Sequence, residues 1–544
     1  MSQRPWISSY GTIPSEVNPL RYPSVHHLLD EAVQRYGKRP AFHAFGASLS
    51  FSDVSALSAR LAAYLQDAAG VEKGARVAVM LPNVPAFPIA FMAICRIGGI
   101  QVNVNPLYTA RELEHQINDS GAEVIIIFDA AIPTLAQIIG STRIRRVISV
   151  APQDCIGGRL GGPEHAIGLE GAVSLPGAIE QGRHLRLVPV ALQGEDLLLL
   201  QYTGGTTGPA KGAALSHRNL VANIEQFKAF MPEALRPGQE VVITAIPLYH
   251  IFALMVNFLC YFAAGAANWL VSNPRDLEGL IGILKVARPT VMTGVNTLYA
   301  ALPIQPGWAE LDLSQLRLSI GGGAAVMKST SDRWQDETGC FILEGYGLSE
   351  TSPVISVNPS STSAFSGTAG MPVPSTDVKL LDAQDREVVA GESGEICVRG
   401  PQVMRGYWQK PEENATAFTP DGYFRTGDIG RFDQNGYLRI VDRKKDMVIV
   451  SGFNVYPNEV ESVAASCPGV AECACVGAPD DRTGEAVMLY AVRQQNSQLS
   501  IQALLAHCRD QLAAYKVPKR VMFVDALPKS TVGKILRREL RQRP

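Results

Sequence analysis

The sequence predicts an α/β protein with a large amino-terminal domain of wound sheets, a β-rich subdomain that closes it, and a small carboxy-terminal α+β domain. At 544 residues, 46% of them hydrophobic, the chain is too long for one core and apolar enough to fill several. Apolar runs alternate with amphipathic helical segments over most of its length. From about residue 376 short strands and turns replace this alternation, and the charge run 442–446 precedes a unit of domain size.

The alternation can be followed element by element in the first part of the chain. Helical spacing of apolar residues predicts amphipathic helices, and short apolar runs bounded by turn residues predict buried strands. The predicted helices cover 24–36, 52–65, a stretch that ends at Ile97, and 111–117, and the predicted strands cover 76–81, 101–104, 124–128 and 146–150. Residues 151–194, rich in Gly and Pro, are expected to form an irregular connection.

The same criteria apply to the rest of the chain. Strands are predicted at 241–246, 290–294, 316–320 and 340–343, and then in the β-rich part at 378–381, 395–398 and 437–441. After the charge run, strands are predicted at 448–450, 473–476, 487–492 and 521–524, and helices at 457–465 and 501–513. This last set predicts a compact α+β domain.

Composition argues against several classes of protein. A net charge of −2 provides no basic field for nucleic acid. The nine cysteines lack the spacing of zinc ligands, and no apolar leader follows Met1, so free thiols in a reducing cytoplasm are expected. The most membrane-like run, 251–267, contains Asn257 and is barely long enough for a span, which favours a buried helix.

The stretch 203–212 has the composition of a phosphate loop. It follows the apolar run 197–200 and consists of Thr-Gly-Gly-Thr-Thr-Gly-Pro-Ala-Lys-Gly. Its glycines let backbone N–H groups converge on one anion, its threonines add hydroxyl donors, and Lys211 adds a positive charge. It is not a Walker loop, because Lys211 follows Pro209-Ala210 and precedes Gly212. From these residues alone, a flexible surface turn is the alternative.

The order of residues in this stretch resembles the phosphate loop of the adenylate-forming superfamily. That superfamily includes acyl-CoA synthetases, peptide-synthetase adenylation domains and luciferases. The resemblance implies that the loop binds the phosphates of ATP and that Thr206 shares a Mg²⁺ ion with Glu350. The implied ATP ligands in the loop are Thr203, Gly204, Gly205, Thr206, Thr207, Gly208 and Lys211.

A second motif, 345–351, presents an aromatic ring, a hydroxyl and a carboxylate after an apolar strand. By its residues alone it is equally a polar turn that caps a helix. It resembles the Tyr-Gly-x-Thr-Glu element of the superfamily, which implies that Tyr346 stacks on adenine, Ser349 contacts the α-phosphate and Glu350 binds Mg²⁺. The flanking glycines, Gly345 and Gly347, are implied ATP ligands as well.

The same resemblance implies roles for residues in three further turns. Gly322 and Gly323 are implied to lie beside adenine and the acyl carboxyl group. Asp428, in the motif 422–428, is implied to accept both ribose hydroxyls. Arg443, in the charge run, is implied to reach the ribose and the phosphates. Without the resemblance, each is an ordinary turn residue.

The carboxy-terminal part contains the movable elements of the superfamily. By resemblance, Lys445 is the hinge in a segment 443–446 that separates a domain 1–442 from a lid domain 447–544. The segment 450–457 resembles the one that lines the pantetheine channel, so Gly452, Phe453 and Asn454 are the implied CoA ligands. Pro528 to Ile535 resembles the element that carries the catalytic lysine, here Lys534.

The implied chemistry explains these parts. A carboxylate is already a competent nucleophile, so its attack on the α-phosphate of ATP needs positioned cations rather than a general base. Lys534 and the Mg²⁺ on Glu350 would supply those cations. In the second step a thiol attacks the acyl-adenylate, and Lys534 would then obstruct it. The small domain is therefore expected to rotate about Lys445 between the two steps.

Within the superfamily the sequence is most similar to bacterial long-chain fatty-acyl-CoA synthetases. The similarity lies in 247–253, 294–298, 343–346, 441–447 and 450–457. It implies that a medium- to long-chain fatty acid is converted to acyl-AMP and then acyl-CoA, with ATP, Mg²⁺ and CoA. The expected acyl-site residues are His250, Phe252 and Gly322, with His250 as a wall of the pocket rather than a base. No tryptophan follows His250 as a gate, which leaves the chain length open.

Three alternatives share some of these features. A fatty-acyl-AMP ligase that loads a carrier protein would use the same adenylation motifs. A luciferase-like oxygenase would share the fold, and a non-enzymatic fatty-acid-binding or uptake module would not need Lys534 and Glu350. Homodimer formation and peripheral contact with the inner membrane are further expectations, the latter because the substrate is apolar.

Overall fold

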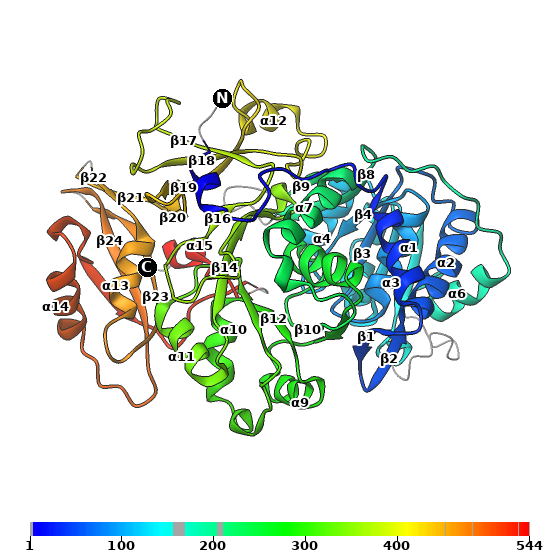
Figure 1. Ribbon diagram of the computed structural model, residues 1–544, viewed down its shortest axis with the longest axis horizontal. Coiled ribbons are helices and arrows are strands. Elements are labelled where there is room, and N and C mark those ends of the chain that lie inside the picture. Colours follow the sequence, from blue (N-terminus) through cyan, green and yellow to red (C-terminus); the bar gives the residue numbers. More distant parts are fainter. Residues whose placement is uncertain are drawn as a thin grey trace.

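The computed structural model describes residues 4–155, 169–203, 210–451, 453–480, 482–530 and 533–542. Within these ranges the chain forms four sheets (Figure 1). Two wound sheets build the large domain, a four-stranded sheet follows them, and a smaller sheet belongs to the carboxy-terminal domain. This is the mixed α/β architecture that the sequence predicts.

The first wound sheet has the strand order β7-β6-β5-β3-β4-β8-β9. Its strands are β3 (Arg76–Met80), β4 (Ile100–Asn103), β5 (Val124–Phe128), β6 (Arg146–Val150), β7 (Val173–Ser174), β8 (Leu197–Thr203) and β9 (Lys211–Ser216). All neighbours are parallel except β8 and β9, which form an antiparallel pair. Val77 and Val79 face one hydrophobic core, and Ala78 and Met80 face another. Both faces are covered, which explains why these strands are continuous apolar runs.

The second wound sheet has the order β16-β15-β14-β13-β12-β10-β11-β1-β2. Its strands are β1 (Pro40–Ala44), β2 (Ala47–Ser50), β10 (Val241–Thr244), β11 (Ala267–Leu270), β12 (Val291–Gly294), β13 (Leu318–Gly321), β14 (Ile342–Gly347), β15 (Val354–Val357) and β16 (Met371–Pro372). Its central strands are parallel, so β12, β13 and β14 end at the same edge. The chain turns that follow them meet there.

The helices of the large domain begin where the sequence provides caps. Ser50, Thr109 and Ser216 each accept a hydrogen bond from the backbone three residues later and start α2, α4 and α7. The helices are α1 (Val25–Tyr36), α2 (Phe51–Asp67), α3 (Ala86–Arg96), α4 (Ala110–Ser120), α5 (Ile132–Ala136), α6 (Leu175–Arg183), α7 (His217–Phe230), α8 (Tyr261–Ala263), α9 (Leu277–Ala287), α10 (Asn296–Ala301), α11 (Lys328–Thr338) and α12 (Pro411–Ala417).

The apolar run after His250 is buried, as predicted, but it is largely a π-helix. The π-helix covers Ala253–Cys260, and every residue in it is buried. Asn257 is accommodated because its amide donates to Ile243 O and Thr244 Oγ1, and its oxygen accepts from Thr293. None of the helices in the described ranges is both long and apolar enough to cross a bilayer.

The β-rich subdomain and the small domain follow in order. The subdomain is the antiparallel sheet β17 (Asp377–Leu381), β18 (Gly394–Arg399), β19 (Phe424–Phe432) and β20 (Leu438–Arg443). The small domain contains β21 (Val448–Val450), β22 (Phe453–Val455), β23 (Val470–Asp480), β24 (Gly484–Arg493) and β25 (Arg520–Phe523), with α13 (Pro457–Ala465), α14 (Ile501–Gln511) and α15 (Arg537–Arg541). The small domain has cores of its own on the two faces of its sheet.

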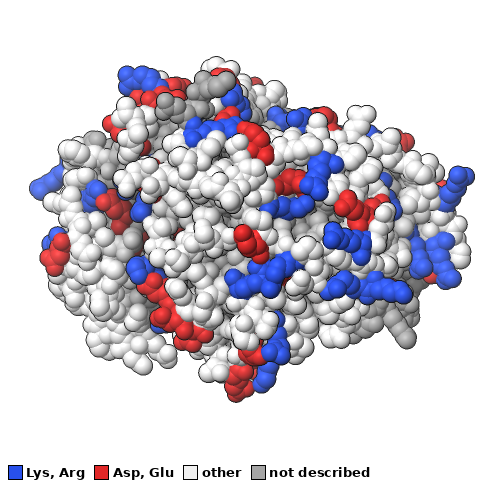
Figure 2. Space-filling model, in the orientation of Figure 1, with Lys and Arg blue, Asp and Glu red and all other residues white. Residues whose placement is uncertain are grey.

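The surface carries mixed charge. On the face shown in Figure 2, basic and acidic side chains are interspersed rather than gathered by sign. The eight cysteines whose side chains the structure describes are all buried thiols, and burial raises the pKa of most of them, as at Cys95 and Cys475.

Candidate functional site

Three of the predicted ATP ligands meet where the β-rich subdomain faces the end of β14. The Tyr346 hydroxyl donates to Asp428 Oδ2 at 2.8 Å, and Arg443 Nε lies 3.3 Å from Asp428 Oδ1. Asp428 and Arg443 are register partners on β19 and β20. Burial raises the pKa of Tyr346 well above its usual value, so its phenol remains a donor. The structure therefore brings together a ring, a carboxylate and a guanidinium that are far apart in sequence.

Two kinds of constraint explain the predicted glycines near Tyr346: close packing and backbone conformation. A Cβ on Gly322 would lie 3.1 Å from the Phe252 ring and 3.6 Å from Gly345 O, so Gly322, Gly345 and Phe252 lie side by side. Gly323 has a φ of +77°, which favours glycine. A Cβ on Gly347 would lie 1.8 Å from Pro353 O, so that glycine is required by the packing of its own turn.

Glu350 lies in a short 3₁₀ turn, Ser349–Thr351, directly after β14. It is only 6% exposed, and the Tyr407 hydroxyl donates to its Oε1 at 2.8 Å. Burial raises its pKa, while Tyr407 opposes that shift. No group of three or more potential metal-ligating side chains occurs in the described ranges. A single carboxylate nevertheless suits Mg²⁺, which is commonly bound by one or two carboxylates together with phosphates and water.

The ends of the predicted phosphate loop lie next to Glu350. Thr203 and Lys211 are register partners in the β8–β9 hairpin, so the loop starts and finishes at one place. Lys211 Nζ lies 5.3 Å from the centre of the Tyr407 ring, and that tyrosine contacts Glu350. The predicted ligands Gly204, Gly205, Thr206, Thr207 and Gly208 lie outside the described residues.

Two of the predicted acyl-site residues, His250 and Phe252, lie after β10, and the third, Gly322, follows β13. The backbone N–H of Phe252 donates to His250 Nδ1 at 3.3 Å. Burial, and to a smaller degree the charge of Lys534, lowers the pKa of His250 to about 4. An imidazole with that pKa is a weak base at neutral pH, which agrees with the interpretation of His250 as a wall.

Lys534 comes from the small domain and reaches this site. A tight turn holds its backbone, because Ser530 N–H donates to Lys534 O and Lys534 N–H donates to Ser530 Oγ. A Cβ on Gly533 would lie 2.7 Å from Thr297 Oγ1, so Gly533 contacts the large domain at α10. Burial lowers the pKa of Lys534 to about 8, with Arg443 adding to the effect and Asp428 opposing it.

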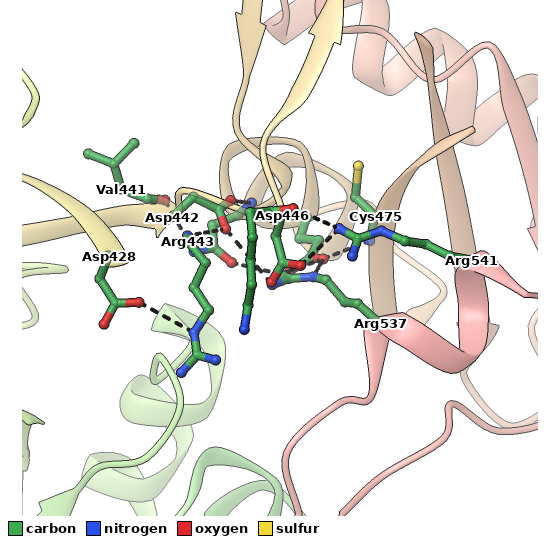
Figure 3. A network of polar contacts seen from close by, with 11 residues as sticks. Asp428, Val441, Asp442, Arg443, Asp446, Cys475, Arg537 and Arg541 are labelled. Atoms are coloured by element: carbon green, nitrogen blue, oxygen red, sulfur yellow. Dashed lines mark hydrogen bonds and ion pairs between the residues drawn. The ribbon is translucent and has the colours of Figure 1, made fainter. Parts of the chain in front are cut away.

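A network of polar contacts surrounds the predicted hinge (Figure 3). Arg537 pairs with Glu461 at 2.7 Å, and Arg541 pairs with Asp446 at 2.8 Å. Asp442 accepts from the backbone N–H of Asn458 at 2.7 Å. Burial lowers the pKa of the hinge residue, Lys445. The division of the chain at 443–446 stays a prediction.

The predicted CoA residues lie elsewhere. Phe453 and Asn454 are exposed on β22, at the outer edge of the small domain and away from β14 (Figure 1). Phe453 packs against Tyr515, with 5.0 Å between ring centres and the ring planes tilted by 30°. Gly452 lies outside the described residues.

Sequence reasoning gave no role to several residues in this region. Tyr407 contacts Glu350 across 57 positions, and nothing local in the sequence indicates that pairing. Glu344 and Asp442 stand inside motifs that carry the family resemblance, and a charged residue at the end of a strand could have drawn attention to both. Arg537 follows Lys534 by three residues, and no motif in the sequence assigned it a role.

The meeting of Tyr346, Asp428 and Arg443, with Lys534 brought to the large domain by the small one, is the arrangement that the resemblance to adenylate-forming enzymes predicts. Residues 29–408 match the model of the AMP-binding enzyme family, and residues 459–534 match that of the AMP-binding enzyme C-terminal domain. The chain belongs to the AMP-binding enzyme family.

Relatives and solved structures agree with this membership. A long-chain-fatty-acid–CoA ligase of Salmonella typhimurium is 48% identical, with 98% of this chain and 97% of that protein covered. A feruloyl-CoA synthase of Amycolatopsis is 36% identical, with 92% and 94% covered. The crystal structure of ATP-bound MatB from Rhodopseudomonas palustris has a TM-score of 0.85 at 30% identity, with 95% of this chain and 98% of that chain covered.

Proposed function

We propose that this protein is an AMP-forming fatty-acid–CoA ligase. It activates a medium- to long-chain fatty acid with ATP, releases pyrophosphate, and transfers the acyl group to CoA. The observation that carries the proposal is that the Lys534 turn of the small domain contacts the large domain, where a Cβ on Gly533 would lie 2.7 Å from Thr297 Oγ1, close enough to Arg443 and Asp428 for their charges to shift the pKa of Lys534. The 48% identity to a long-chain-fatty-acid–CoA ligase supports the choice of acid.

In the first step a carboxylate oxygen attacks the α-phosphorus of ATP, and pyrophosphate leaves. Tyr346 and Gly322 bind adenine, Asp428 accepts the ribose hydroxyls, and Arg443 and Ser349 contact the ribose and phosphates. Lys534 as an ammonium bridges the carboxylate and the α-phosphate, where negative charge accumulates. Thr203, Lys211 and the loop between them hold the β- and γ-phosphates.

Glu350 and Thr206 hold the metal in this proposal. A Mg²⁺ ion bound there would neutralise charge on the departing pyrophosphate. The carboxylate is held by Tyr407 in a buried turn, and its raised pKa reflects a buried anion that a cation would stabilise.

In the second step the CoA thiol attacks the acyl carbon, and AMP leaves. Lys534 would stand in the way of the thiol, so the small domain rotates about Lys445 and presents Gly452, Phe453 and Asn454 instead. The exposed position of Phe453 and Asn454 supports this proposal, because both are accessible for a second contact.

Residues near the acyl site differ in how deeply they are buried, and this difference distinguishes those that can contact the acid from those that pack the core. Leu254, Met255 and Phe258 are fully buried in the main core, whereas Phe252 is half-buried against Gly322. Phe252 therefore faces the acyl carboxyl end, and the others pack the fold. Each buried CH₂ of a tail contributes about 0.8 kcal/mol, so a longer pocket strongly favours longer acids.

The test is AMP production by the purified protein with ATP, Mg²⁺, CoA and acids of graded length from C4 to C18, with ferulate as a competing class. We expect the highest kcat/KM between C10 and C18. Acyl-AMP formation without CoA-dependent AMP release would indicate a carrier-loading ligase. A preference for ferulate would contradict the choice of acid, and tight fatty-acid binding without AMP would contradict the enzyme.

We also propose that the protein works in the cytoplasm, touches the membrane peripherally and forms a homodimer. ATP and CoA are available in the cytoplasm, and an apolar acid partitions into bilayers. Co-sedimentation with lipid vesicles and light scattering of the purified protein test these two associations separately.

A further inference from the structure

The contacts around Lys445 fall into two groups (Figure 3). One group lies wholly after the hinge: Arg541 pairs with Asp446, and Arg537 pairs with Glu461 and, at 3.5 Å, with Asp446. The other group joins β20, which precedes the hinge, to the small domain. It consists of contacts that Asn458 and Arg537 make with the last residues of β20.

The crossing contacts centre on Asp442. Its Oδ2 accepts from Asn458 N–H at 2.7 Å, and Arg537 Nη1 lies 3.9 Å from its Oδ1. The amide of Asn458 also donates to Val441 O at 3.1 Å. Asp442 is 1% exposed, and burial raises its pKa even though Arg537 and two backbone N–H groups oppose that shift.

Asp442 performs the task of a helix cap for α13. This helix starts at Pro457, and its own N-cap residue, Tyr456, makes no side-chain hydrogen bond to it. Asn458 N–H is one of the donors that a helix leaves without an internal partner, and Asp442 accepts from it. A carboxylate also interacts favourably with the positive end of the helix dipole. The large domain therefore completes a helix of the small domain.

Asn458 and Glu461 connect the capped end of α13 to the segment that carries Lys534. Arg537, three residues after Lys534, donates to Asn458 Oδ1 at 2.8 Å and pairs with Glu461 on the next turn of α13. Glu461 in turn accepts from Cys475 N–H at 2.7 Å, which ties α13 to β23. The start of α13 and the segment that carries Lys534 are thus one rigid unit, and its orientation is set where α13 meets Asp442.

We propose that Asp442 is a positioning residue for the first half-reaction: by capping α13 across the hinge, it holds the small domain where Lys534 reaches the site. The proposal rests on the proposed function, with rotation about Lys445. Asp442 precedes Lys445 and stays with the large domain, whereas Asn458 and Arg537 move with the lid. Rotation therefore breaks the Asp442 contacts and keeps those of Asp446 and Glu461.

The test compares Asp442→Ala with Arg541→Gln, which removes a contact of the same network that lies on one side of the hinge. Pyrophosphate–ATP exchange measures the first half-reaction, and CoA thioester formation from added acyl-AMP measures the second. We expect Asp442→Ala to slow exchange about tenfold, the equilibrium equivalent of a lost helix cap, with thioester formation equal or faster. Asp442→Asn, which keeps an acceptor oxygen, should recover part of the exchange rate, and Arg541→Gln should leave the ratio of the two rates unchanged.

A distance measurement checks the cause. Nitroxide labels at Ala309→Cys in the large domain and Gln498→Cys in the small domain are both on exposed residues. In Asp442→Ala the distance distribution should broaden or shift, and in Arg541→Gln it should match the parent. A fall of both rates by the same factor in Asp442→Ala, or a distance distribution identical to that of the parent, would overturn the proposal. A parent that shows no exchange with any fatty acid would instead refute the proposed function.

Discussion

The predicted ATP ligands of the large domain and Lys534 of the small domain are held in different ways. Asp428, Tyr346 and Glu350 are fixed by hydrogen bonds between strands and turns of the large domain. The Lys534 ammonium, by contrast, forms no hydrogen bond or ion pair with any residue in the described ranges. Its backbone is positioned by Ser530, by the contact of Gly533 with α10, and by Arg537, three residues later, which bonds to α13. The side chains that are predicted to bind the nucleotide are therefore held by polar partners, whereas the ammonium that is predicted to act in one half-reaction has no such partner among the described residues.

The largest effect should come from removing the Lys534 ammonium. Lys534→Ala should slow adenylation by about 10³-fold, the scale of losing one preorganised group that stabilises developing charge. Thioester formation from added acyl-AMP should stay within about threefold of the parent, because the lysine is withdrawn in that step. Pyrophosphate exchange and CoA thioester assays measure the two rates.

Lys529→Ala is the matched control, because Lys529 lies on the same segment but pairs with Glu472 on the surface of the small domain. It should leave both rates near those of the parent. Equal losses in both half-reactions for Lys534→Ala would show that the lysine belongs to the cradle rather than to a lid.

In the large domain, Glu350→Gln should slow adenylation by about 10²-fold and raise the Mg²⁺ concentration needed for half-maximal rate. The amide keeps an oxygen for the Tyr407 hydroxyl but loses the charge that attracts the metal. Tyr407→Phe removes the hydrogen bond alone and should cost only several-fold. A Mg²⁺ dependence that is unchanged in Glu350→Gln would place the metal elsewhere.

The pH dependence sharpens the same contrast. The pKa of Lys534 is lowered to about 8, so its ammonium is lost as the pH rises through that value. The kcat/KM of adenylation, which reports the free enzyme, should fall about tenfold per pH unit above 8. Lys534→Arg keeps its charge, so this basic limb should disappear from its weaker profile, and a limb that persists would belong to another group.

The smallest effect concerns stability at the edge of the cradle. Burial raises the pKa of Glu344 from 4.5 to about 7, although Val326 N–H donates to its carboxylate. Between these values the folded protein keeps a proton that the unfolded chain releases, so stability falls as the pH rises. Glu344→Gln should therefore raise the free energy of unfolding by about 2 kcal/mol at pH 8 and by much less at pH 5. Urea unfolding at both values measures this, and an equal gain at both would refute the shift.

Much of the fold follows from local patterns in the sequence. The runs at 124–128 and 146–150 are buried strands at the predicted positions, and Ser50 and Thr109 start helices as capping residues do. The length of the apolar run and its Asn257 predicted a buried helix after His250 but not its π form.

The candidate site likewise contains features that the sequence predicts and features that it does not. Tyr346, Asp428 and Lys534 stand in motifs, so their meeting could be expected from the family resemblance. The contact of Tyr407 with Glu350 and the capping of α13 by Asp442 could not be, because each depends on a distance across the fold that no short motif encodes. The orientation of the small domain likewise depends on contacts that both domains make.

The most direct test of one site used in two orientations is Lys445→Pro, which restricts the backbone at the predicted pivot. The account predicts that this variant exchanges pyrophosphate into ATP at a rate within about threefold of the parent, and that its formation of CoA thioester from added acyl-AMP falls by at least about 10²-fold. If both rates fell together, or if thioester formation persisted, the rotation of the small domain about Lys445 would be contradicted.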